Sequence, residues 1–241
     1  MENIFSNVGE KFLRDEMNIC MVDLTDKIIS DASQHQVFFG ELIDTMINLK
    51  LPYEYSCLGS DENSENKKYI SQQFSKFIEK YNITEEDMAY SIFDNLCHAF
   101  VVFKEFGLYG LHKNRAAECW YPKVIIRENI GSRDDIDPLC DEIIAYRGTS
   151  KDEYDSKKFG QAWTLAREVA DDFAFTHYPG QDCYENTQRV ILKTTINKDF
   201  IYRFKKSDNE QELILDERKI FFESVEIIKE KLLENRTIID E

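Results

Sequence analysis

The sequence changes character at EIIAYRGTS (Glu142–Ser150), an apolar run that ends in an arginine and a glycine. Residues 143–146 are typical of a short buried strand, and Gly148 predicts a turn at its end. Before this stretch, apolar residues recur at spacings of three and four, which predicts helices. After it, short runs rich in β-branched residues predict strands. A series of helices followed by a series of strands indicates an α+β fold and argues against βαβ winding.

The N-terminal half is predicted to be helical over residues 3–51 and 69–81, with a polar loop over residues 59–66. Thr84 is a candidate N-cap of a further helix that the glycines at 107 and 110 break. The segment 121–127 is compatible with a strand. We therefore expect a helical region over residues 1–140, either part of one compact unit or a small separate lobe, and a β-rich core over residues 141–241.

Within the β-rich core, four apolar runs predict strands, and the tail has a helical or mixed pattern over residues 225–235. The four runs are residues 190–196, 200–202, 213–215 and 219–222.

The composition fits a folded protein with an acidic surface. The chain has 241 residues, 42% of them hydrophobic, which excludes wholesale disorder. Its formal net charge of −16 repels a nucleic-acid backbone at long range, although a local basic groove could still bind one. The same charge suits a basic partner protein.

The cysteines and histidines do not form a metal-binding pattern. Six cysteines are scattered without C-x-x-C spacing, and the four histidines are equally dispersed. Buried thiols in a reducing compartment are the expectation, with no metal site. No apolar segment resembles a signal peptide or is long enough to span a bilayer, so we expect a cytoplasmic location without membrane contact.

Three short segments of the sequence, which we call the first, second and third islands, contain side chains that could take part in binding or catalysis. In the first, Arg147 follows a predicted strand, and its planar guanidinium can pair bidentately with phosphate oxygens; a surface ion pair is the alternative. In the second, Trp163 and Thr164 precede a helical pattern over residues 165–174, and Trp163 can equally be a core aromatic residue.

The third island contains two carboxylates two residues apart, Glu210 and Glu212. If the following strand already begins at Glu210, both side chains project from the same face of the sheet. Two negative charges at that distance repel each other, so a cationic ligand or partner is expected nearby. The alternative is a solvated acidic loop.

In this order and spacing, the three islands resemble the R-S-E class of mono-ADP-ribosyltransferases, a toxin-like family. Tyr146-Arg147-Gly148 matches the arginine element, and Glu210-Gln211-Glu212 matches the Glu-x-Glu element. Ala162-Trp163-Thr164 stands where the family has Ser-Thr-Ser, so the hydroxyl that helps to hold the catalytic glutamate is missing at Ala162. The resemblance covers residues 142–215.

The resemblance implies a split β-sandwich core that binds NAD, the substrate, in a central cleft without a metal. Arg147 would bind the NAD phosphates or the nicotinamide-side ribose, within a cofactor site that includes Tyr146, Gly148, Trp163 and Thr164. Glu212 would be catalytic, stabilising the oxocarbenium-like transition state through the ribose. Glu210 would orient or deprotonate the acceptor.

The implied activity is transfer of ADP-ribose to a macromolecular acceptor, either a protein side chain or an RNA or DNA base. By analogy, such an enzyme would be an intracellular toxin or a phage-conflict effector, with a neutralising antitoxin protein as partner. Two alternatives stay open: an NAD glycohydrolase that uses water, and a non-catalytic binding module with the same fold.

Overall fold

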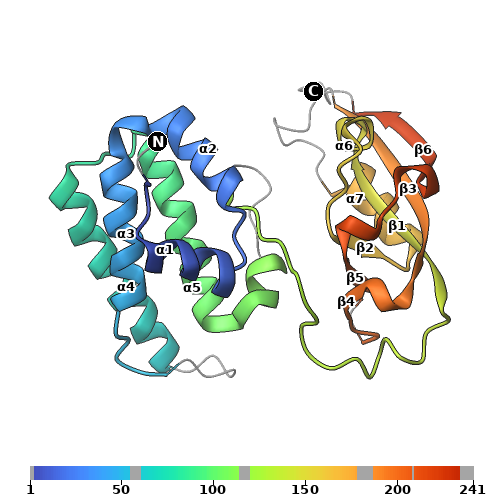
Figure 1. The fold of residues 1–241 in the computed structure, drawn as a ribbon, viewed down its shortest axis with the longest axis horizontal. Coiled ribbons are helices and arrows are strands. Elements are labelled where there is room, and N and C mark those ends of the chain that lie inside the picture. Colours follow the sequence, from blue (N-terminus) through green and yellow to red (C-terminus); the bar gives the residue numbers. More distant parts are fainter. Residues whose placement is uncertain (1–2, 55–60, 114–119, 178–186, 208, 234–241) are drawn as a thin grey trace, which may run out of the picture. The chain divides into compact units, whose positions relative to one another are not determined.

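A computed structural model describes residues 3–54, 61–113, 120–177, 187–207 and 209–233 (Figure 1). The chain forms two compact units, Met1–Ile125 and Ile126–Glu241. Among the described residues, no helix is long and apolar enough to cross a membrane.

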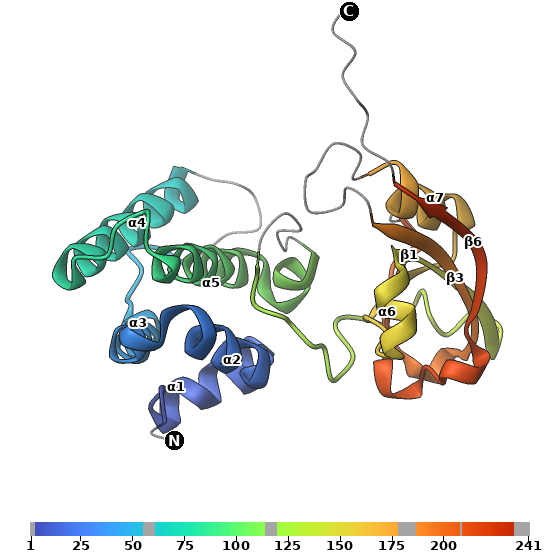
Figure 2. The ribbon, with the colours of Figure 1, turned by 90° about the horizontal axis from the view of Figure 1, so that it is seen from above.

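The first unit is helical, as the spacing of its apolar residues predicts, and its helices appear in blue to green in Figures 1 and 2. Phe38, Phe39 and Phe100 are at most 1% exposed, so aromatic side chains lie in the core of this unit. The helices are α1 (Asn7–Lys11), a π-helical turn (Phe12–Glu16), α2 (Met21–Ala32), a 3-10 turn (Ser33–His35), α3 (Gln36–Asn48), α4 (Asp61–Tyr81) and α5 (Met88–Lys113).

Three local predictions in the helical unit need correction. The loop predicted over residues 59–66 is already helical from Asp61, where Asn66 is buried and bonds both backbone groups of Tyr53. Helix α5 begins at Met88, four residues after Thr84, whose N–H and hydroxyl donate to the Asp87 carboxylate. The segment 121–127 makes a single bridge, from Val124 to Ile19, in place of a strand. Gly107, by contrast, does break the helical geometry of α5.

The second unit contains an open, fully antiparallel six-stranded sheet in the order β4-β5-β2-β1-β3-β6. The α+β class is therefore confirmed, while the split β-sandwich stays a prediction. Figure 2 shows β3 and β6 side by side. The elements are β1 (Glu142–Ser150), α6 (Lys151–Ser156), β2 (Ala162–Thr164), α7 (Arg167–Phe175), β3 (Gln188–Asn197), β4 (Ile201–Phe204), β5 (Glu212–Leu215) and β6 (Glu226–Leu232), with 3-10 turns at Lys198–Phe200, Glu217–Lys219 and Phe222–Ser224.

Three predictions for this unit also change. Strand β1 does not end at Gly148 but continues to Ser150, because β3 pairs with it along its whole length. Residues 219–222 contribute to 3-10 turns and form no strand. The tail forms β6, since the edge of β3 supplies backbone partners that its local helical pattern does not reveal.

The two faces of the sheet pack differently. The core face holds the main apolar cluster, which includes Ile143, Ala145, Trp163, Leu192 and Leu213. The opposite face, which we call the α7 face, packs against helix α7 through a smaller cluster of Ala170, Ala174 and Ile191. The strand alternation assigns every other residue to each face.

Gly148 allows α7 to lie directly on strand β1. A Cβ atom at this position would lie 2.1 Å from the Ala170 carbonyl oxygen and 2.6 Å from the Ala174 nitrogen. Both neighbours are backbone atoms, so a side chain here would displace the helix. The sequence marks this glycine as a turn residue, but its role is close packing.

Residues 126–140 belong to the sheet unit. This unit therefore begins before residue 141, the boundary predicted from the sequence. Ile136 is fully buried in the core cluster, and Leu139 packs against it. The backbone N–H of Ile126 donates to Gln161 Oε1 at 2.7 Å, and its carbonyl accepts from Gln161 Nε2 at 2.8 Å. These contacts anchor the segment to the sheet although it has no regular structure.

We predict that a fragment of residues 126–241 unfolds cooperatively, whereas a fragment of residues 141–241 does not. The shorter fragment lacks Ile136 and leaves the buried Gln161 amide without its Ile126 partners, a loss of at least about 3 kcal/mol. Thermal unfolding followed by near-ultraviolet circular dichroism would compare them. Equal melting temperatures would contradict this assignment of the segment.

Candidate functional site

A row of polar side chains crosses the middle of the α7 face. The strand register pairs Tyr146 with Lys193 and with Thr164, and pairs Thr164 with Glu212. Residues directly opposite one another in antiparallel strands share a face. We call these four residues, Lys193, Tyr146, Thr164 and Glu212, the polar row. It brings together one residue from each of the three islands.

The α7 face is open beside the polar row. Helix α7 covers the face at Gly148, two residues along β1 from Tyr146. On the other side of Tyr146, Ile144 is 47% exposed. Among the described residues, this end of the face is therefore accessible to a ligand from solvent.

Thr164 ties the second island to the third. Its hydroxyl donates to the Glu210 carbonyl oxygen at 2.7 Å and accepts from the Ala166 N–H at 3.0 Å. The residue is 5% exposed, so both bonds are shielded from water. Thr164 thereby fixes the backbone that leads into β5 and the turn that leads into α7.

The two carboxylates differ in their backbone settings. Strand β5 begins at Glu212, which is half-buried in the polar row. Glu210 lies in the preceding turn, and Gln211 between them has a φ of 45°. If strand β5 began at Glu210, strand alternation would place Glu210 on the same face as Glu212. Because Glu210 lies in a turn, strand alternation does not determine where its side chain points.

Trp163 faces away from the polar row. It is 2% exposed within the core cluster, and its indole N–H donates to the Gly160 carbonyl oxygen at 2.9 Å. The core interpretation of this residue is the one that the structure supports. A contact between Trp163 and a cofactor stays a prediction.

Arg147 also lies on the core face, in the interior of β1. Its Nε donates to Glu153 Oε1 at 2.7 Å and its Nη2 donates to Glu153 Oε2 at 2.9 Å. Its Nη1 donates to the backbone carbonyl of Ala162 on β2. The two side chains are only 13% and 19% exposed, so this bidentate ion pair is largely buried.

The sequence around Glu153 builds this ion pair locally. The Ser150 hydroxyl caps α6 by accepting the Glu153 N–H at 3.2 Å, which places Glu153 in the first helical turn. The Thr149 hydroxyl and the Gly160 N–H also donate to the Glu153 carboxylate, at 2.7 and 2.9 Å. A Cβ atom on Gly160 would lie 2.5 Å from Arg147 Nη2, so the guanidinium needs a glycine there.

The charge state of Glu153 follows from these contacts. Burial by itself would raise the pKa of the carboxyl group. The charge and hydrogen bonds of Arg147, with those of Thr149 and Gly160, outweigh burial and lower the pKa from 4.5 to about 2. Glu153 is therefore ionised at neutral pH and holds Arg147 on the core face. Binding of the NAD phosphates by Arg147 stays a prediction, one that would require this pair to open.

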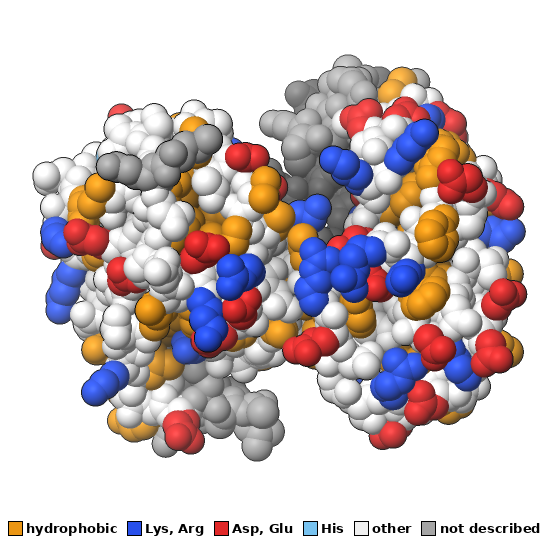
Figure 3. Space-filling view, in the orientation of Figure 1, with side chains coloured by type: hydrophobic (Ala, Val, Ile, Leu, Met, Phe, Trp, Pro, Cys, Tyr) orange, Lys and Arg blue, Asp and Glu red, His pale blue; other side chains and the backbone are white. Residues whose placement is uncertain are grey.

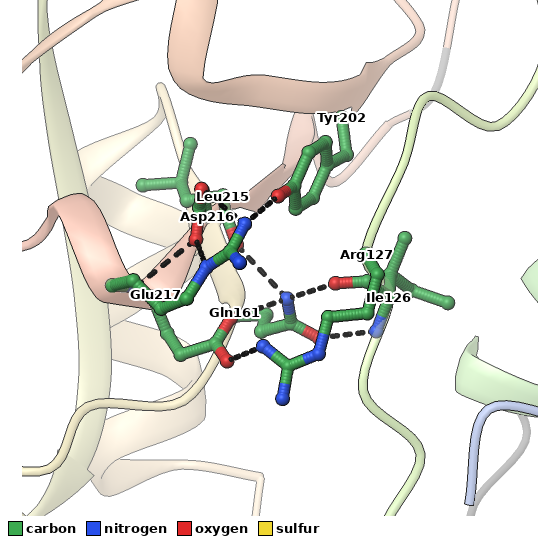
Figure 4. A network of polar contacts seen from close by, with 8 residues as sticks. Ile126, Arg127, Gln161, Tyr202, Leu215, Asp216 and Glu217 are labelled. Carbon is green, nitrogen blue, oxygen red and sulfur yellow. Dashed lines mark hydrogen bonds and ion pairs between the residues drawn. The ribbon is translucent and has the colours of Figure 1, made fainter. Parts of the chain in front are cut away.

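A second polar network surrounds Gln161, a residue that the sequence analysis missed (Figure 4). Its amide group bonds Ile126 and donates to the Leu215 carbonyl oxygen at 3.2 Å and to Glu217 Oε2 at 2.7 Å. Glu217 also accepts from Arg127 at 2.6 Å. This network joins the incoming chain to the ends of β2 and β5. A single glutamine two residues before a tryptophan carries no sequence signal for this network.

The surface charges are mixed. On the face drawn in Figure 3, acidic and basic side chains are interspersed on both units. No group of three or more His, Cys, Asp or Glu side chains that could hold a metal ion occurs within the described ranges. Burial raises the pKa of the Cys97 thiol well above its ordinary value, which leaves this thiol protonated.

No protein-family model, curated protein or solved structure matches the chain. The family resemblance therefore rests on the three islands of the sequence alone.

We predict that Arg147→Met lowers the free energy of unfolding by about 3 to 5 kcal/mol, because it leaves the buried Glu153 carboxylate without its cation. The double variant Arg147→Met/Glu153→Leu should lose less, since neither charge remains buried. Urea unfolding measures both. Lys68→Met, which removes a cation from an exposed pair with Glu65, is the control and should change stability by less than about 1 kcal/mol. Wild-type stability in the single Arg147 variant would contradict a structural role for this pair.

The pH dependence of stability should report Glu153. Its pKa is lowered on folding from 4.5 to about 2, so its stabilising contribution is complete above pH 4.5 and disappears as the pH falls toward 2. The contribution is about 3 kcal/mol. Urea unfolding between pH 6 and pH 2 (roughly the window over which such a carboxylate titrates) should show a flatter profile for Glu153→Gln than for the wild type. Parallel profiles would argue against the lowered pKa.

Proposed function

We propose that the protein is an NAD-dependent mono-ADP-ribosyltransferase that modifies a macromolecular acceptor. One observation carries the proposal: three islands that are distant in sequence contribute neighbouring strands, β1, β2 and β5. Tyr146, Thr164 and Glu212 thereby lie abreast on one face. If the three motifs resembled the family only by chance, there would be no reason for them to lie on neighbouring strands.

The chemistry assigned to Glu212 is electrostatic. In the proposed reaction, the bond between the ribose C1′ atom and the nicotinamide nitrogen breaks, and its electron pair leaves with neutral nicotinamide. Positive charge then develops on the ribose, where a fixed carboxylate stabilises it. Glu212 is half-buried at the start of a strand, so its position is fixed by the sheet.

The acceptor completes the reaction by forming a new bond to C1′ and losing a proton. Glu210 lies in the turn beside Glu212, where the hydroxyl of Thr164 holds its backbone. A carboxylate in a turn next to the reacting centre is suited to orient or deprotonate the acceptor. Thr164 is a positioning residue in this scheme, and Tyr146 offers an aromatic ring to the ligand from the same face.

The acceptor is a protein side chain or a nucleic-acid base. The net charge of −16 favours a basic protein over a polyanion at long range. The proposed role is that of an intracellular toxin or a phage-conflict effector, which implies a neutralising antitoxin protein as partner.

A non-catalytic binding module is the second candidate, and two observations favour it. Ala162 lacks the hydroxyl that the middle element of the family supplies. In addition, Arg147 donates to Glu153 and to the Ala162 carbonyl group and faces the core. Activity measurements separate this candidate from the transferase and from an NAD glycohydrolase.

The test is incubation of the protein with NAD labelled in the ADP-ribose part, with and without a cell lysate, while nicotinamide release is measured. A transferase releases nicotinamide and leaves label on macromolecules, and protease or nuclease treatment then shows which class carries it. Nicotinamide release without macromolecular label indicates a glycohydrolase. The absence of both activities would leave the binding module.

We predict that Glu212→Gln lowers both nicotinamide release and acceptor labelling by roughly a hundredfold, because it removes the charge that opposes the oxocarbenium-like ribose. Glu210→Gln should lower labelling more than release, since water needs less orientation than a large acceptor. Both reactions would be followed side by side on each variant. Full activity in Glu212→Gln would remove the catalytic assignment, and equal losses in both variants would show that the roles are not divided.

A further inference from the structure

Lys193 is the cationic member of the polar row, and the sequence analysis did not single it out. It lies on β3 directly opposite Tyr146, on the α7 face. Its neighbours on β3, Leu192 and Thr194, are buried on the other face, where Leu192 belongs to the core cluster. The row thus has a carboxylate at the Glu212 end and an ammonium group at the Lys193 end.

We infer that Lys193, and not Arg147, contacts the diphosphate of the dinucleotide, an inference that rests on the proposed function. The register supplies the geometry. Glu212 and Lys193 are three strand positions apart along the order β5-β2-β1-β3, which at about 4.8 Å for each step gives roughly 14 Å between their backbones. The flexible four-carbon stem of Lys193 shortens the distance between the charged groups. A ribose at Glu212 can therefore continue into a diphosphate near Lys193.

The two cations differ in how readily they can exchange partners. Arg147 is held by a buried, bidentate pair with an ionised carboxylate. Lys193 pairs with Glu226 at 3.4 Å, and the two side chains are 33% and 65% exposed. Exposed pairs of this kind contribute little, so a ligand phosphate can replace the Glu226 carboxylate at small cost. The buried pair does not offer this exchange.

The register also places Arg189, Lys229 and Arg203 on this face. Arg189 and Lys229 donate hydrogen bonds to helix α7, so Arg203 is the cation to compare with Lys193. Arg203 lies opposite Ile214 on the strand beyond β5, and its Nη1 atom is buried. Glu212 Oε2 is buried as well, so burial of one atom alone does not exclude Arg203, but the Lys193 side chain is 33% exposed and lies beside the accessible Ile144. Lys193 is therefore the better candidate, and Arg203 serves as a comparison in the test.

Glu226 provides a second test of the phosphate contact at Lys193. Because its carboxylate competes with phosphate for Lys193, its removal should strengthen dinucleotide binding. A merely structural pair gives the opposite expectation, since loss of either partner would then weaken the site or leave it unchanged. Opposite signs for the two variants are thus a distinctive result.

The experiment is calorimetric titration of the full-length protein with three ligands: an NAD analogue whose nicotinamide bond cannot break, ADP-ribose, and nicotinamide riboside, which lacks the diphosphate and the adenosine. Lys193→Gln should raise the Kd of the first two about tenfold and leave the riboside unchanged. Glu226→Gln should lower the Kd of the first two about twofold to fivefold. Lys68→Gln, an equal charge change in the helical unit, should have no effect.

An unchanged Kd of the NAD analogue in Lys193→Gln overturns the inference, as does an equal loss for nicotinamide riboside. A diphosphate-dependent loss in Arg203→Gln with none in Lys193→Gln reassigns the contact to Arg203. In each case, nicotinamide release by the wild type still supports the proposed function. A wild-type protein that neither binds the analogue nor releases nicotinamide overturns both proposals.

Discussion

The buried ion pair between Arg147 and Glu153 sets the arrangement of the sheet unit. It connects the central strand β1 to α6 through Glu153 and to β2 through the Ala162 carbonyl group. The Thr149 hydroxyl and the Gly160 N–H complete the shell around the carboxylate. Since an ionised carboxylate in this environment requires its cation, the guanidinium stays on the core face. The opposite face carries the polar row.

The two faces of the sheet consequently have different environments. The core face combines the apolar cluster around Trp163 with the buried ion pair. The α7 face is covered by helix α7 at Gly148 but presents the polar row beside the exposed Ile144. This division explains how the arginine of the first island can be structural while the remaining members of the islands still line one surface. Strand alternation places Ala162 and Thr164 on the α7 face and Trp163 on the core face.

Much of this architecture could be predicted from the sequence. Periodicity identified the helices of the first unit, the α+β class and the strand β3, because these features depend on local patterns. The face on which Arg147 lies could not be predicted, because it depends on strand register and on a partner that α6 supplies. Strand β6 was missed because its residues suit a helix until β3 offers an edge. Lys193 and Gln161 gave no signal because their roles arise only when distant strands pair.

The central claim is that the α7 face, with Glu212 and Lys193 at the two ends of the polar row, is the surface that binds NAD. The most direct measurement is a crystal structure with an NAD analogue whose nicotinamide bond cannot break. We expect the nicotinamide-side ribose within hydrogen-bonding distance of Glu212, the diphosphate at Lys193, and Arg147 still paired with Glu153. A dinucleotide whose phosphates are bound by Arg147, with Glu153 displaced, would contradict this account.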